Sequence, residues 1–210
     1  MNSPLAIDHV FRASQLLAPS SESHQPLELE GFQGQLSELS ATRGQAYLSL
    51  LFDLIAQSQR RGEPAAWIGD RPTLFYGPDA RHRRIDWEAV VLISLSSAQA
   101  RAVAADQLLR SGAFGLVIID LAGATAPHIG SPLMHRLAQW SRRHHSATLF
   151  INDITAESSA LSSLLQRRVS ARWSDVDAEQ LVATYTITKD KRGAPGAQIE
   201  EVYDGPMGLR

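Results

Sequence analysis

The chain contains no cysteine in its 210 residues. This absence excludes disulfide bonds, thiol catalysis and cysteine-ligated zinc, and it is typical of proteins from a reducing compartment. No apolar run approaches the roughly 18 residues that a membrane-spanning helix needs. The opening stretch, MNSPLAIDHVFRAS, lacks the basic segment followed by a long apolar one that marks a secretory signal. We therefore expect a cytoplasmic protein with no membrane attachment.

Lysine is nearly absent as well. The chain has 20 Lys and Arg residues, of which only Lys189 and Lys191 are lysines, and its formal net charge is -2. Proteins whose main partner is nucleic acid usually carry a strong positive charge. We therefore expect no direct contact with nucleic acid, or only a weak one. The hydrophobic content of 44% is enough for one α/β domain with a full-sized core.

The order of apolar segments predicts a mixed α/β fold. Strands separated by helices predict a mostly parallel sheet flanked by helices, and later alternating segments predict antiparallel strands at the C-terminal end. Ser96 or Ser97 and Ser131 are expected to cap two helices, while Gly62 and Gly112 are expected to end two. The expected helices are 46–60, 97–110 and 131–144, and the expected strands are 36–39, 65–68, 90–95, 115–120, 148–154, 169–173, 181–188 and 197–203.

The segment from 34 to 52 has the strand–turn–helix layout of a nucleotide-binding P-loop without its functional groups. A working P-loop needs a glycine-rich turn around the phosphates, a lysine on the β- and γ-phosphates and a hydroxyl on Mg²⁺. Here the turn ends at Gly44, Gln45 stands at the lysine position and Ala46 stands at the hydroxyl position. Gln balances no phosphate charge and Ala binds no metal. We therefore expect no nucleotide cofactor and no metal at this degenerate P-loop.

Three other segments resemble the core of the RecA recombinases, in the same order along the chain. They are ARAVAADQLLRSGAFGLVIIDLAGA (100–124), TLFINDI (148–154) and ITKDKRGAP (187–195). The resemblance extends over about 34–203 and implies a RecA-like core domain at 34–210, preceded by an N-terminal segment at 1–33 that contains a flexible stretch. It also implies that the C-terminal DNA-gathering domain of RecA is absent.

The resemblance places changed residues at the positions that RecA uses for catalysis and for DNA. Asp120 matches the Walker-B carboxylate that helps to hold Mg²⁺, and we interpret it as a vestige of the fold. Arg71 stands at about the position where RecA has the glutamate that activates water, and arginine cannot accept a proton from water. The segments matching the two DNA-binding loops, 123–131 and 154–159, are short and lack the cations and aromatic rings that bind single strands. Asp153 stands where RecA senses the γ-phosphate, and its charge would repel phosphate. The resemblance thus implies a protein that is not an enzyme.

Three further groups of residues have structural interpretations. His144 and His145 follow two arginines at a helix end, where cations suit the helix dipole, and no further metal ligands occur at suitable spacing. The basic clusters 81–84 and 167–168 are interpreted as solvated surface that could rim an acidic partner. The tryptophans fall on or near predicted core elements, so packing explains them best: Trp67, Trp87, Trp140 and Trp173.

Both lysines of the chain lie in one segment, TKDKRGAP. In RecA filaments the two lysines of the matching segment reach the ATP γ-phosphate of the neighbouring subunit. The resemblance therefore implies a partner-binding site at Lys189, Lys191 and Arg192 that completes the nucleotide site of another protein. A solvated turn between two antiparallel strands, with Gly193 and Pro195 as turn residues, explains the segment equally well.

Two RecA-like families without a competent ATP site fit this pattern. The chain resembles the ImuA proteins in its size and in its TKDK segment, and ImuA acts with ImuB in an inducible mutagenesis cassette. This resemblance implies a role in translesion synthesis after DNA damage, in the SOS response, through contacts with RecA recombinase and an ImuB-like polymerase homologue. A SulA-like inhibitor of cell division that binds FtsZ is an alternative. A divergent ATPase of the RecA/KaiC type is a second alternative, against which Gln45 and Ala46 argue.

Overall fold

The computed structural model of the chain describes residues 27–40, 46–70, 83–124, 127–153, 161–177, 180–193 and 195–204. The turn with Gly44 and Gln45, the position of Arg71, the loop at 154–159 and most of the N-terminal segment lie outside these residues. The predictions made for them are therefore carried forward as predictions.

An eight-stranded sheet with the order β3-β2-β4-β5-β1-β6-β7-β8 forms the centre of the fold. The strands from β3 to β6 in this order pair in parallel, and β6, β7 and β8 pair in antiparallel. The predicted class, a mostly parallel sheet with antiparallel strands at the C-terminal end, is confirmed. The strands are β1 Gln35–Ser40, β2 Ala65–Gly69, β3 Val90–Ser94, β4 Leu116–Asp120, β5 Ala147–Asn152, β6 Arg167–Asp177, β7 Gln180–Asp190 and β8 Gln198–Asp204.

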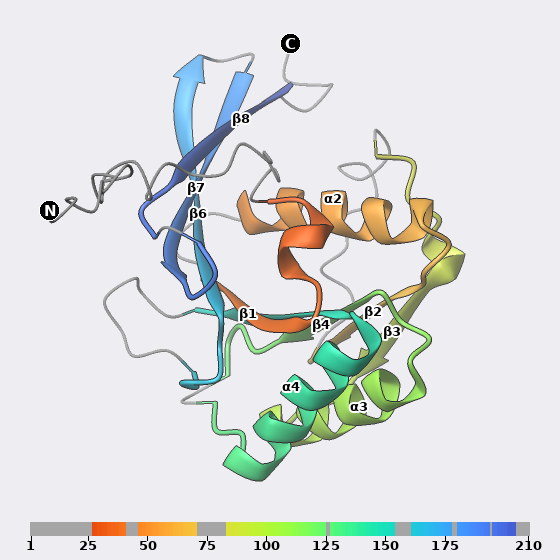
Figure 1. Cartoon of the computed structure of the whole chain (residues 1–210). Helices are drawn as coiled ribbons and strands as arrows, with labels where there is room; N and C mark the ends of the chain where they lie inside the picture. Colours follow the sequence, from red (N-terminus) through yellow and green to blue (C-terminus); the bar gives the residue numbers. More distant parts are fainter. Residues whose placement is uncertain are drawn as a thin grey trace, which may run out of the picture.

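Helices cover both faces of the parallel strands (Figure 1). The helix α2 (Ala46–Arg60) packs on one face, and α3 (Ala98–Ser111) and α4 (Ser131–His144) pack on the other. Two short 3₁₀ helices, η1 (Leu29–Phe32) and η4 (Trp87–Ala89), contribute to the α2 side. Because both faces are covered, β4 and β5 are buried along their whole length, as their unbroken apolar runs predicted. None of the described helices is long and apolar enough to cross a membrane.

The predicted signals at the helix ends are mostly confirmed. Ser97 caps α3, since its hydroxyl accepts a hydrogen bond from the N–H of Ala100 at 3.1 Å. Gly62 and Gly112 follow α2 and α3 in the left-handed conformation, with φ of 75° and 71°. These two glycines end their helices where the sequence placed the ends.

The prediction that Ser131 caps α4 is wrong by one residue. The N-cap is Gly130, and Ser131 is already the first helical residue. The carbonyl of Gly130 accepts hydrogen bonds from the N–H groups of Leu133 (3.0 Å) and Met134 (3.1 Å). Pro132 therefore lies inside the first turn, where its missing N–H costs no helical hydrogen bond.

Candidate functional site

The carboxyl ends of the parallel strands form the edge at which a nucleotide would bind in this class of sheet. Here β1 ends at Ser40 and α2 begins at Ala46, so the degenerate P-loop joins them at this edge. Ala46 is fully buried, and its carbonyl accepts a hydrogen bond from the hydroxyl of Tyr185 on β7 at 3.3 Å. The start of α2 is thereby attached to the C-terminal strands.

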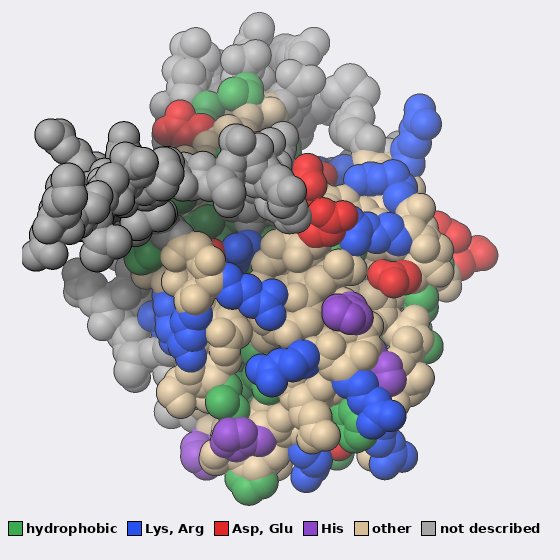
Figure 2. All heavy atoms as spheres, viewed as in Figure 1, with side chains coloured by type: hydrophobic (Ala, Val, Ile, Leu, Met, Phe, Trp, Pro, Cys, Tyr) green, Lys and Arg blue, Asp and Glu red, His purple; other side chains and the backbone are tan. Residues whose placement is uncertain are grey.

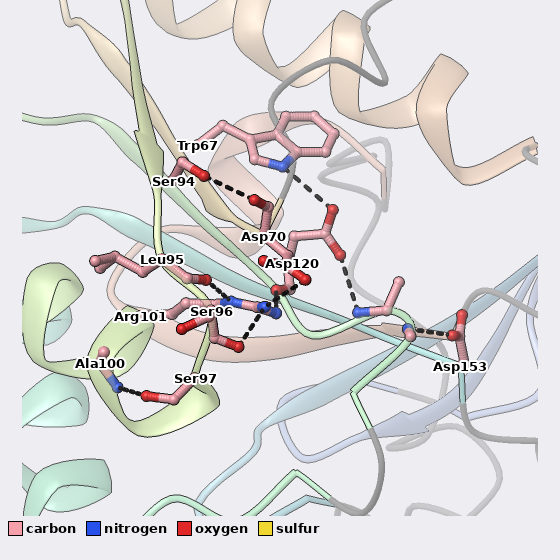
Figure 3. A network of polar contacts seen from close by, with 12 residues as sticks. Trp67, Asp70, Ser94, Leu95, Ser96, Ser97, Ala100, Arg101, Asp120 and Asp153 are labelled. Atoms are coloured by element: carbon pink, nitrogen blue, oxygen red, sulfur yellow. Dashed lines mark hydrogen bonds and ion pairs between the residues drawn. The ribbon is translucent and has the colours of Figure 1, made fainter.

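Asp120 lies at the end of β4 and is engaged by the protein itself (Figure 3). Its Oδ2 accepts a hydrogen bond from the indole N–H of Trp67 at 3.4 Å, and its Oδ1 accepts one from the backbone N–H of Ala122 at 3.0 Å. Burial raises the pKa of this carboxyl. Both oxygens therefore serve structural hydrogen bonds, which gives Asp120 a role beyond that of a vestigial metal ligand.

We expect Asp120→Ala to lower the free energy of unfolding by about 1–3 kcal/mol, because the buried indole N–H of Trp67 and the half-buried backbone N–H of Ala122 lose their acceptor. Chemical denaturation of the purified protein measures this change. Glu200→Ala is the matched control, since it removes an exposed carboxylate on β8. An Asp120→Ala protein as stable as the wild type would show that the carboxylate has no structural role.

Tyr47 lies in the first turn of α2, which begins at the same edge. The residue is only 9% exposed and belongs to the core cluster on the α2 side. Burial, followed by the negative charges of Asp120 and Asp153, raises its pKa to about 12. A buried phenol thus lies near the two carboxylates that the resemblance associates with metal and phosphate. The sequence analysis missed Tyr47, although a bulky aromatic directly after Ala46 was the available signal.

Arg101 joins three chain segments at this edge (Figure 3). Its side chain is 3% exposed and donates hydrogen bonds to the carbonyls of Leu95 (2.7 Å), Ser96 (3.1 Å) and Asp120 (2.7 Å). Its guanidinium also lies 3.8 Å from the carboxylate of the exposed Asp70. Arg101 therefore fixes the end of β4 to the start of α3, and sequence reasoning gave it no role.

A cavity of about 500 Å³ lies beside Arg101, between the start of α3 and the segment after β4. Asp70 and Arg101 give it one acidic and one basic side chain. The other lining residues are small or neutral: Ser96, Ser97, Ala98, Gln99, Ala122, Gly123, Ala124, Pro127 and His128. Arg101, the basic side chain among the described lining residues, already donates hydrogen bonds to three backbone carbonyls.

Asp153 is exposed just after β5, as expected for a strand end. Its carboxylate accepts a hydrogen bond from the backbone N–H of Gly123 at 2.6 Å (Figure 3). This bond connects the ends of β5 and β4. The negative charge at the position of the phosphate sensor therefore has a partner inside the protein.

The interpretation of Arg167 and Arg168 as solvated surface is wrong. Arg167 is 8% exposed and Arg168 is 7% exposed, because β6 lies inside the sheet between β1 and β7. Arg167 forms an ion pair with Asp190 at 2.8 Å, and Arg168 forms one with Glu38 at 2.7 Å. Glu38 lies on the buried strand β1 and is 1% exposed. Both cations thus stabilise the sheet and are not available to a polyanion.

The partner-binding candidates lie at the opposite edge of the sheet from the degenerate P-loop. Because β7 runs antiparallel to β6, its end at Asp190 pairs with Arg167 at the beginning of β6. Lys191 follows β7, and its ammonium group donates a hydrogen bond to the carbonyl of Ser163 at 2.7 Å. Lys191 and Arg192 are exposed, as a turn between β7 and β8 predicts.

Lys189 is half-buried and lies next to other cations. In the sheet register it stands opposite Arg168. Its pKa is lowered, first by burial and then by the positive charges of Lys191 and Arg168. Lys191 follows the end of β7 two residues after Lys189, and its positive charge is close enough to act on Lys189. Together they form a small cationic site, which we call the lysine pair.

The remaining candidates have structural roles. His145 follows α4 with a positive φ of 55°, and His144 stacks on the ring of Trp140 with centroids 6.1 Å apart. Among the described residues, no group of three His, Cys, Asp or Glu side chains is placed to hold a metal ion. The prediction that the tryptophans belong to the core is confirmed for Trp67, which is buried, and for Trp87, Trp140 and Trp173, which pack against the core half-buried. In the basic cluster 81–84, Arg83 forms an ion pair with Asp53, and positions 81 and 82 lie outside the described residues.

Comparison with known proteins agrees with this architecture. The chain matches no protein-family model. It is 29% identical over 143 residues to the protein RecA of Corynebacterium pseudotuberculosis (strain C231). This similarity supports a RecA-like relationship. The match covers 62% of this chain and 38% of that RecA, so the chain spans well under half of its length. The RecA-like relationship accounts for the α/β core, and it leaves the activity and the partners to be proposed.

Proposed function

We propose that this RecA-like protein is not an enzyme and acts in the SOS response to DNA damage. It takes part in translesion synthesis by binding RecA and an ImuB-type polymerase homologue. One observation carries the proposal: in the described part of the nucleotide edge both carboxylate oxygens of Asp120 accept hydrogen bonds from the protein, whereas the lysine pair lies at the other edge with Lys191 exposed. This arrangement supports a protein that contributes to a partner's nucleotide site.

Three features of the nucleotide edge support the absence of catalysis. Gln45 and Ala46 supply neither a phosphate anchor nor a metal hydroxyl. Both carboxylate oxygens of Asp120 accept hydrogen bonds from the protein. The buried ring of Tyr47 lies near this carboxylate. A nucleotide would have to displace these contacts without gaining a lysine in return.

We expect titration calorimetry with ATP at millimolar Mg²⁺ to show no binding heat, and a phosphate-release assay to show no hydrolysis. RecA measured under the same conditions is the positive control. A micromolar dissociation constant for ATP that is lost in Asp120→Ala would contradict the proposal and favour the divergent ATPase.

The positive charge of the lysine pair favours a negatively charged ligand, and we infer that this ligand is a phosphate group held by a partner protein. Burial, and after it the positive charges of Lys191 and Arg168, lower the pKa of Lys189, and the nearby charge of Glu38 acts in the opposite direction. A polyphosphate placed against the lysine pair would relieve the repulsion between these positive charges and form charge-assisted hydrogen bonds. The ATP held at a RecA filament end is such an anion. The protein would then cap the filament, because its own nucleotide edge cannot accept the next subunit.

Affinity capture with three purified baits separates the candidate functions. We expect the full chain to retain RecA in the presence of a non-hydrolysable ATP analogue, to form a complex with an ImuB-type protein on co-expression, and to leave FtsZ unbound. Capture of FtsZ without RecA would overturn the proposal in favour of the SulA-like alternative. Capture of none of the three would reject both.

A further inference from the structure

A second basic surface lies beside the turn that precedes β1. Arg142 and Arg143 close α4, His145 follows them, and Arg192 comes from the segment after β7. All four residues are exposed. We call these four residues the basic patch. It shares only Arg192 with the partner site proposed above.

The turn at Gln33 and Gly34 brings the two parts of the basic patch together. The guanidinium of Arg192 donates a hydrogen bond to the carbonyl of Gln33 at 3.5 Å. Gly34 has a positive φ of 68°, and a Cβ atom added there would lie 3.8 Å from the Cα of Arg142 and 3.9 Å from Nδ1 of His145. Gly34 thus lies close to the end of α4, and Gln33 beside it binds Arg192. Both parts of the basic patch therefore border the same turn.

The charges of the basic patch are not balanced by described carboxylates. Six ion pairs are formed within the described residues, and none of them involves an arginine of the patch. The helix α4 contains no acidic residue between Ser131 and His144. In the view of Figure 2, Lys, Arg and His side chains are spread across the lower part of the visible face, and most acidic side chains lie in its upper part and at its right edge. The negative end of the helix dipole offsets part of the repulsion, and an anionic ligand would offset more.

The geometry points to an acidic segment of a partner protein as the ligand of the basic patch. Arginine forks pair bidentately with carboxylates. An extended acidic segment presents the carboxylates of alternate residues about 7 Å apart, so that one segment can meet several cations grouped around the turn at Gln33 and Gly34. The basic patch does not include Lys189 or Lys191. A partner bound there would therefore make a contact in addition to those of the proposed function.

Two observations favour carboxylates over a nucleic-acid backbone. Single-strand binding usually combines a basic track with free aromatic faces on which bases stack. The ring of Trp140, the aromatic residue next to the patch, is already stacked by His144, and Arg143 lies 5.8 Å from its centroid. The net charge of -2 would also repel a long polyanion outside the patch.

Fluorescence anisotropy with the full chain tests this inference. The probes are a labelled peptide of about twelve residues with alternating Glu and Gly, the same peptide with Gln in place of Glu, and a single-stranded oligonucleotide of similar length. At about 50 mM salt we expect the Glu peptide to bind and the Gln peptide not to bind. Arg142→Gln combined with Arg143→Gln should weaken binding of the Glu peptide at least about fivefold.

The matched control combines Arg60→Gln with Arg172→Gln, which removes the same charge from exposed arginines elsewhere. This control should keep the wild-type affinity, and thermal unfolding verifies that both double variants fold. If both double variants lost the same affinity for the Glu peptide, the effect would come from net charge alone, and the inference would be overturned. So would failure of the Glu peptide to bind, or an oligonucleotide that binds as tightly as the peptide. Unchanged binding of RecA by the Arg142→Gln/Arg143→Gln variant would separate this surface from the proposed function.

Discussion

Arg168→Ala should lower the free energy of unfolding by about 3–5 kcal/mol, the usual cost of removing one partner from a buried ion pair. The guanidinium of Arg168 lies 2.7 Å from the carboxylate of Glu38, which is 1% exposed on the central strand β1. Without the arginine, this buried charge retains a hydrogen bond of 3.3 Å from the amide of Asn152. Urea denaturation followed by circular dichroism measures the loss.

Two variants make this result specific to the ion pair. Arg172→Ala removes an exposed arginine from the same strand, and we expect a change within about 0.5 kcal/mol. The double variant Glu38→Leu/Arg168→Leu should recover much of the loss, because no charge is then left buried. A loss below about 1 kcal/mol in Arg168→Ala would show that solvent reaches Glu38 and that β6 is not held in the sheet by this pair.

The combined change Lys189→Ala and Lys191→Ala should weaken binding to ATP-bound RecA by at least about tenfold. Two ammonium groups that contact one polyphosphate contribute charge-assisted hydrogen bonds, and their removal should mainly raise the dissociation rate. Surface plasmon resonance with immobilised RecA and a non-hydrolysable ATP analogue measures both rates.

The control for this variant separates the site from the overall charge and from folding. Arg60→Ala combined with Arg172→Ala removes two exposed cations elsewhere and should leave the affinity unchanged. Lys191 also donates a hydrogen bond to Ser163, so thermal unfolding must verify that the lysine variant is folded. Affinity that does not respond to the lysine substitutions would place the RecA contact on another surface of the fold.

The sequence predicted the elements of this fold well because their signals are local. The apolar runs at 116–120 and 147–152 are buried strands, and the period of α2 and α3 together with Gly62 and Gly112 marked two helices and their ends. The start of α4 is an exception, since the N-cap is Gly130 and not Ser131. So is β6, which spans Arg167–Asp177 where a strand over 169–173 was expected.

The functional residues were harder to predict because their roles depend on contacts between distant segments. Arg167 and Arg168 were predicted as surface since nothing local shows that β6 lies between β1 and β7. A glutamate inside the buried strand β1 was the available signal, because a buried carboxylate needs a cation. Tyr47 and Arg101 likewise acquire their roles from the ends of other strands. The lysine pair was predicted from resemblance, and the register adds that Lys189 stands opposite Arg168.

The affinity of the full chain for RecA in two nucleotide states tests the central claim most directly. The dissociation constant is to be measured with a non-hydrolysable ATP analogue and again with ADP, with no nucleic acid present. We predict binding at least about tenfold tighter with the analogue, because only that state offers a γ-phosphate to Lys189 and Lys191. Equal affinity in the two states, or no binding in either, would contradict a protein that completes the nucleotide site of RecA.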